Sequence, residues 1–130
     1  MKTKKQTRIG NKELLEIMFS DECDALFCSV EATIDVATPE RLRPEMTALL
    51  EFMGGLAYNN FDGEAAVSFI QKNLKSLYRI RFGREYSPVF YFHLACPMPE
   101  KKAAFEADLR KALKPDECHW EGNALRAWFD

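Results

Sequence analysis

The spacing of apolar residues changes along this chain, and that change is the feature that most constrains its fold. From Ala25 to Ala37 apolar residues recur at every second position, which is typical of a β-strand with one buried face. Other segments repeat their apolar residues at helical spacing. The two faces of the predicted strand carry Leu26, Cys28, Val30, Ala32, Ile34 and Val36 on one side and Ser29, Glu31, Thr33 and Asp35 on the other.

Four segments with helical spacing also carry signals for the start or end of a helix. Asparagine, threonine and aspartate side chains can accept bonds from the first free amides of a helix, and proline fits its first turn. Gly54-Gly55 can bend or end the second helix. The helices are predicted to begin at Asn11, at Thr38-Pro39, after Asp62 and after Pro97-Met-Pro99, and the last ends at Lys114-Pro115.

Two further segments are predicted to form hairpins. Tyr78, Ile80 and Phe82 alternate with arginines, a turn follows over 83–88, and 89–96 is rich in aromatic and β-branched residues. Gly122-Asn123 lies between two apolar segments as either a hairpin turn or the bulge of one strand.

These elements predict an α+β fold: an antiparallel sheet of four to five strands with helices mainly on one face. The order indicates a split βαβ (ferredoxin-like) arrangement with an extra N-terminal helix and two helices in the first crossover. We expect residues 1–12 to be a basic tail that could be flexible, and residues 13–130 to form a single domain. This fold serves unrelated activities, so it does not assign a function.

The cellular location is predicted from what the sequence lacks. The basic start is not followed by the continuous apolar run of a secretory signal, and no run is long enough to cross a membrane. The four cysteines are therefore interpreted as reduced thiols. We expect a cytoplasmic protein that does not bind membranes.

No stretch of the sequence has the spacing of a catalytic, metal or cofactor site. Cys23, Cys28, His93, Cys96, Cys118 and His119 are the possible soft metal ligands, but none forms a Cys-x-x-Cys pair. Cys118 and His119 are neighbours on a predicted strand, so their side chains should point apart. Glu31 and Asp35 are too far apart along one strand for a paired-carboxylate hydrolase. We therefore expect no cofactor, and a binding protein rather than an enzyme.

Charged residues are sorted into blocks. Residues 13–64 contain twelve acids and two bases, whereas 65–84 contain five bases and no acid. Acidic residues held together repel one another unless a partner neutralises them. We therefore expect a small inhibitor, an immunity protein or a complex subunit that binds a basic protein, such as a nuclease or a nucleic-acid-binding machine. The residues assigned to that surface are Glu13, Glu16, Asp21, Glu22, Asp24, Glu31 and Asp35.

The basic block offers an alternative function, which is binding of single-stranded nucleic acid. Cations would follow the phosphate backbone while aromatic rings stack on bases. The opposing interpretation is that Tyr78, Ile80 and Phe82 are core and that the arginines pair with the acidic block, for example Arg79 and Arg81 with Glu31 and Asp35. Oligomeric state is left open. The residues of this alternative site are Lys72, Lys75, Arg79, Arg81, Arg84 and Tyr86.

Overall fold

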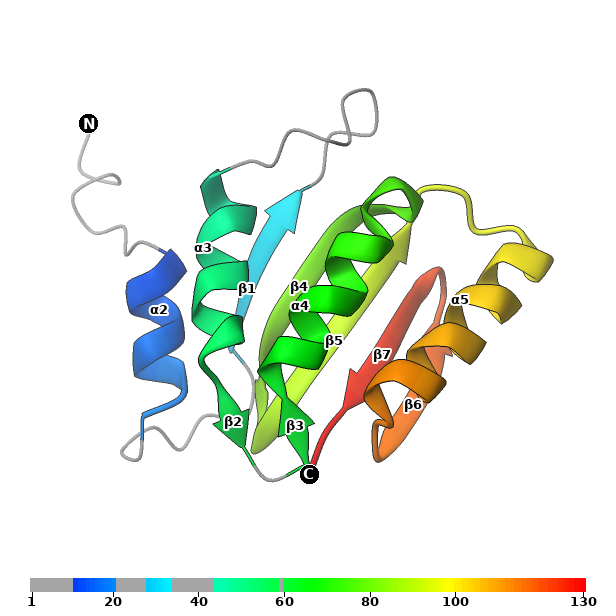
Figure 1. The fold of residues 1–130 in the computed structure, drawn as a ribbon. Helices are drawn as coiled ribbons and strands as arrows, with labels where there is room; N and C mark the ends of the chain where they lie inside the picture. The colour runs from blue at the N-terminus through cyan, green and yellow to red at the C-terminus, as the bar shows by residue number, and fades with distance from the viewer. Residues whose placement is uncertain (1–10, 21–27, 34–43, 59) are drawn as a thin grey trace.

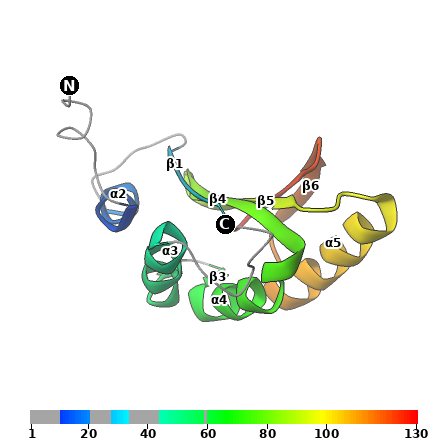
Figure 2. The ribbon, with the colours of Figure 1, turned by 90° about the horizontal axis from the view of Figure 1, so that it is seen from above.

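Helices cover one face of a five-stranded antiparallel sheet in the computed structural model of this chain (Figure 1, Figure 2). The structure describes residues 11–20, 28–33, 44–58 and 60–130. The predicted α+β class with an antiparallel sheet is confirmed. In chain order the elements are α2 (Asn11–Met18), β1 (Cys28–Thr33), α3 (Pro44–Gly54), β2 (Ala57–Tyr58), β3 (Phe61–Asp62), α4 (Gly63–Lys72), the 3₁₀ turn η1 (Leu74–Ser76), β4 (Leu77–Glu85), β5 (Ser87–Leu94), α5 (Pro99–Leu113), β6 (Glu117–Glu121) and β7 (Ala124–Trp128).

The strand order corrects the ferredoxin-like prediction. The sheet runs β1-β4-β5-β7-β6, so β1 lies at an edge and pairs antiparallel with β4, the next long strand in the sequence. Two helices, α3 and α4, cross the sheet in opposite directions between these strands and return the chain to the end where β1 stopped (Figure 1). Only the crossover through the single helix α5 has the split form, because β7 lies between β5 and β6.

The main core lies between the sheet and the helices. Three phenylalanines on the covered face, Phe82, Phe90 and Phe92, are fully buried, and their neighbouring ring centroids are 4.6 and 4.9 Å apart. Phe69 and Phe105 bring α4 and α5 onto Phe92, with centroids 5.9 and 5.5 Å from its ring. Burial of these large apolar side chains stabilises the packing of the helices on the sheet.

The β4–β5 hairpin differs from the prediction in two places. A register shift between Leu77 and Arg79 breaks the alternation, so Leu77 is buried and Tyr78, predicted to be core, is 38% exposed. The predicted turn over 83–88 is also too long, because β4 continues to Glu85 and β5 begins at Ser87. The chain reverses at Tyr86, whose φ is +66°.

Several predicted helix and turn signals are confirmed. The Asp62 carboxylate accepts hydrogen bonds from the amides of Glu64 and Ala65 at the start of α4. Helix α5 ends with Lys114 in the left-handed conformation. Gly122 has a φ of +65° in a two-residue turn, so the final segment is a hairpin rather than one bulged strand.

Some predicted features lie outside the described residues. They include the Thr38-Pro39 helix start, the ends of the 25–37 strand beyond β1 and residues 1–10 of the basic tail. Helix α3 is described from Pro44 and ends at Gly54, in agreement with the stop predicted there.

Candidate functional site

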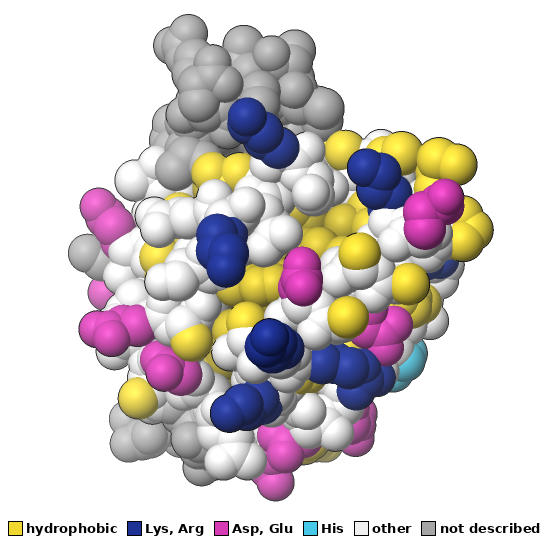
Figure 3. Space-filling model, turned by 45° about the vertical axis from the view of Figure 1, so that its right-hand side comes forward, with side chains coloured by type: hydrophobic (Ala, Val, Ile, Leu, Met, Phe, Trp, Pro, Cys, Tyr) yellow, Lys and Arg dark blue, Asp and Glu magenta, His cyan; other side chains and the backbone are white. Residues whose placement is uncertain are grey.

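A groove runs along the outer surface between α4 and α5. It consists of three adjoining hollows of about 250, 430 and 310 Å³. Asn73 and Asp108 line both the first and the second hollow, and Ala112 lines both the second and the third. In Figure 3 an apolar stripe crosses this face with basic side chains around it. We call it the α4–α5 groove; its members on the two helices and the connecting turn include Ala65, Phe69, Lys72, Asn73 and Lys75 on one side and Lys101, Ala104, Phe105, Asp108, Lys111, Ala112 and Lys114 on the other.

The groove forms because large side chains lie at its floor and small ones along its walls. Phe69 and Phe105 meet edge to face with ring centroids 5.3 Å apart, and both are nearly buried. Above them the walls carry Ala65, Ala104 and Ala112, whose methyl groups leave space that longer side chains would fill. The result is a concave apolar surface on the helical layer, which is a geometry that binding sites favour.

Lysines border the groove on both sides. Lys72 is the last residue of α4 and Lys75 lies in η1, while Lys101, Lys111 and Lys114 belong to α5 or directly follow it. All five are exposed, and none forms an ion pair with a described carboxylate. The groove therefore presents a basic rim whose charge is available to a ligand.

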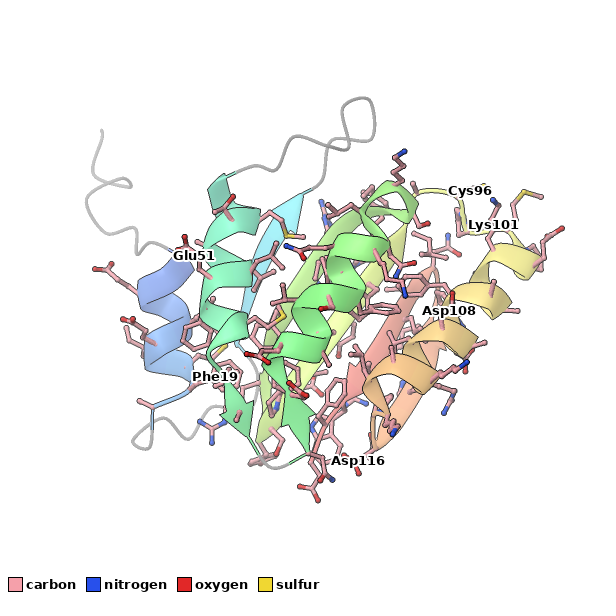
Figure 4. All side chains as sticks on the ribbon, viewed as in Figure 1. Phe19, Glu51, Cys96, Lys101, Asp108 and Asp116 are labelled. Carbon is pink, nitrogen blue, oxygen red and sulfur yellow. The ribbon has the colours of Figure 1, made fainter. Side chains whose placement is uncertain are left out.

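Three carboxylates also border the groove, in distinct places. Asp108 lies near its middle, on the side of α5 that faces α4, with Lys101 nearer the start of the helix (Figure 4). Glu100 lies at one end, and Asp62 lies at the other, where it already caps α4. Among the described residues, Asp108 is therefore the only carboxylate in the middle of the groove, where lysines lie on either side of it.

The sheet face away from the helices carries a second set of polar residues, which we call the uncovered sheet face. Its centre is Arg126, which donates to Glu85 at 2.6 Å and to Glu117 at 3.0 Å. The Tyr91 hydroxyl donates to the same Glu85 carboxylate at 2.8 Å. Burial alone would lower the pKa of Arg126, but its hydrogen bonds to the two glutamates raise it on balance. These groups bind one another and hold β4, β5, β7 and β6 together.

The structure separates the residues of the predicted nucleic-acid site. Lys72 and Lys75 border the α4–α5 groove, whereas Arg79 and Arg81 lie on the opposite side of the sheet. Arg81 stacks on the Tyr91 ring, 4.4 Å from its centroid. The remaining two lie beside the β4–β5 turn. Arg84 donates to the carbonyls of Met18, the last residue of α2, and of Ser20. Tyr86 is 62% exposed.

The predicted acidic surface is described only in part. Glu13 and Glu16 are exposed on α2. Glu31 lies on β1 at the position paired with Arg81, while Thr33 is paired with Arg79. The remaining members, Asp21, Glu22, Asp24 and Asp35, lie outside the described residues, so the acidic surface stays a prediction.

The histidines and cysteines of the described chain lie apart. Cys118 packs toward the core, while its neighbour His119 lies 3.0 Å from Glu121 on the other side of β6, as alternation predicts. Cys96 is exposed after β5. In the part of the chain that the structure describes, no three His, Cys, Asp or Glu side chains are grouped to hold a metal ion.

Replacing Tyr91 with phenylalanine tests the uncovered sheet face. Burial, followed by the hydrogen bond to Glu85, raises the pKa of Tyr91 above 10.0. The folded state therefore keeps this proton at a pH where the unfolded chain loses it, and the stabilisation is present below pH 10 and lost as pH rises through the folded pKa. We expect Tyr91→Phe to cost about 1 kcal/mol at neutral pH and to make the alkaline loss of stability less steep. Urea denaturation at a series of pH values measures both effects. If the free energy of unfolding falls equally steeply with alkaline pH in wild type and Tyr91→Phe, the prediction is contradicted.

Comparison with known proteins finds no matching protein-family model, curated protein or solved structure. Within the described ranges, no helix combines the length and the apolar character needed to cross a bilayer. The α4–α5 groove was missed from the sequence, because the lysines of α5 are mixed with acids in a segment of nearly balanced charge. Alanines and lysines repeating along one side of that helix are the signal that could have found it.

Proposed function

We propose that this protein is a non-enzymatic interaction module that binds a segment of a partner protein in the α4–α5 groove. This keeps the expected class, an inhibitor, immunity protein or complex subunit, but assigns it a different surface. The observation that carries the proposal is the groove itself, a described hollow with a phenylalanine floor, alanine walls and lysines without described ion-pair partners. Concave apolar surfaces with a polar rim are where protein segments dock.

The other two surfaces have less support. On the uncovered sheet face Arg126 and Glu85 satisfy each other, and Arg81 stacks on Tyr91. The nucleic-acid alternative requires Lys72 and Arg79 to act together, although the sheet separates them. The acidic surface against a basic protein rests on Glu13 and Glu16 among the residues with described side chains.

Filling the groove tests the proposal. Peptides that bind the wild-type protein are selected from a displayed library of random helical and extended sequences, and their affinities are then measured for groove variants. Ala104→Trp and Ala112→Trp place a large ring in the groove, and each should weaken the selected peptides at least about tenfold, because the ring occupies the volume that the peptide needs. Ala103→Trp is the matched control, since Ala103 is exposed on α5 but does not line the groove.

The outcomes separate the candidate surfaces. The proposal is supported if the peptides bind the two groove variants more weakly and bind Ala103→Trp as tightly as wild type. Thermal unfolding must show that all three variants are folded. If the peptides bind the groove variants as tightly as wild type but no longer bind when Glu13 and Glu16 are changed to lysine, binding would be assigned to the acidic surface instead.

A further inference from the structure

We propose that the segment held in the α4–α5 groove is an acidic amphipathic helix. This rests on the proposed function and names the chemistry of its partner. Three features of the groove carry the inference: the nature of its walls, the placement of its lysines and the position of Asp108.

The walls favour a helix over an extended segment. A bound strand needs the unpaired backbone amides and carbonyls of a sheet edge, whereas α4 and α5 bond their backbone groups internally. Along the two helices the groove can therefore offer a ligand only side-chain contacts. From Lys101 to Lys114 the α5 side measures about 20 Å at the helical rise, which matches a bound helix of about 14 residues. One apolar stripe at helical spacing would lie on Phe69, Phe105 and the wall alanines.

The lysines determine the sign of the partner's charge. Lys72 and Lys75 lie on the α4 side, and Lys101 and Lys111 lie on the α5 side, so a helix in the groove would have cations along both of its flanks. None of the four is neutralised by a described carboxylate. Glutamates or aspartates flanking the apolar stripe on both sides would pair with them, and lysines there would be repelled.

Asp108 is the exception to that pattern in the middle of the groove, whereas Glu100 and Asp62 lie at its two ends. It lies in the middle of the groove, between the lysines of either side. A partner carboxylate at this point would face a like charge, so the bound helix should carry a neutral or basic residue there. This single position would set where along the groove the helix binds, because a shifted helix would bring an acid against Asp108.

The composition of the selected peptides tests the inference. Sequencing the groove-dependent binders should show glutamate and aspartate enriched on both sides of an apolar stripe, relative to the unselected library. Enrichment of lysine and arginine, or of extended sequences, would overturn the acidic helix while leaving a groove-binding module in place. Failure to select any groove-dependent peptide would instead overturn the proposed function.

Charge-reversal variants test the same point with one synthetic acidic helix from the selection, labelled for fluorescence anisotropy. Lys111→Glu should weaken it at least about fivefold, and the loss should shrink at high salt. Lys12→Glu is the control, because it changes the net charge equally at a position on α2, far from α5 (Figure 1). Asp108→Asn should tighten binding about threefold by removing the like charge. Equal affinities for wild type and Lys111→Glu, or tighter binding of short single-stranded DNA at the same lysines, would overturn the proposal.

Discussion

Gly63→Ala is expected to lower the free energy of unfolding by about 3 kcal/mol or more. Gly63 begins α4 and is buried where that helix passes the end of α3. A Cβ on this residue would lie 1.8 Å from the Met53 carbonyl oxygen and 2.6 Å from that of Leu56. Both neighbours are backbone atoms, so relief requires α3 and α4 to move apart. The Gly63 amide also donates to Leu56 at 3.0 Å, and that movement would strain the bond.

Gly54→Ala is the matched control for this prediction. Gly54 is the last residue of α3, and the nearest neighbour of an added Cβ would be a Val67 methyl group at 3.9 Å. Alanine there should leave stability unchanged or raise it by up to about 1 kcal/mol, because it restricts the unfolded chain and favours the helix. Urea denaturation of both variants measures the difference. Similar stabilities for the two would show that the approach of α4 to α3 is looser than the structure indicates.

Arg126→Met is expected to lower the free energy of unfolding by about 2 kcal/mol. The methionine keeps most of the side-chain length but leaves Glu85 without its cation, and Glu85 is only 24% exposed. Removing one partner of a buried ion pair costs 3–5 kcal/mol when burial is complete, and partial exposure of this pair reduces the effect to about 2. The Tyr91 hydroxyl would remain as a donor to Glu85, but it does not carry the balancing charge.

Glu117→Gln provides the comparison for Arg126→Met. Glu117 accepts from the same guanidinium, but its side chain is 57% exposed, so water can replace much of the interaction. We expect a cost below about 1 kcal/mol, measured by the same denaturation method. If Glu117→Gln is as damaging as Arg126→Met, the guanidinium is held mainly by β6 rather than by the β4–β5 hairpin.

Signals that depend on adjacent residues made much of the fold predictable. Asp62 caps α4 because its carboxylate needs only the next two or three amides, and Gly122 turns the last hairpin because glycine accepts a positive φ. The alternation within β4 likewise identified Ile80 and Phe82 as core. Each of these requires no knowledge of distant elements.

The errors in the predicted fold arose where contacts between elements distant in the sequence determine the structure. The sequence contains both helices of the first crossover, but their consequence for β1 appears only when the directions of successive elements are followed through the fold. The chain reverses from β1 into α3, from α3 into α4 and from α4 into β4, and these three reversals make β4 antiparallel to β1. Tyr78 is exposed because pairing with β5 shifts register beside it. Strand pairing, rather than the composition of β4, fixes both outcomes.

The candidate site was predictable only in part. Lys72 was identified as part of a basic block, but its partners in the sequence, such as Arg79, lie across the sheet from it. Its neighbours across the groove, Lys111 and Ala112, are about 40 residues away in the chain. Phe69 on α4 packs against Phe105 on α5, and this contact brings the two sides of the groove together. No local sequence pattern predicts that contact.

The edge position of β1 has a consequence for how the sheet assembles. The pairs between β1 and β4 join residues about 50 positions apart, whereas the β4–β5 and β6–β7 hairpins each close over a turn of one or two residues. Loop-closure entropy therefore opposes docking of β1 far more than formation of either hairpin. Because β1 also has a neighbour on one side only, its loss exposes a single ladder and leaves the other four strands paired. We therefore expect the two local hairpins to form before β1 joins the edge of the sheet.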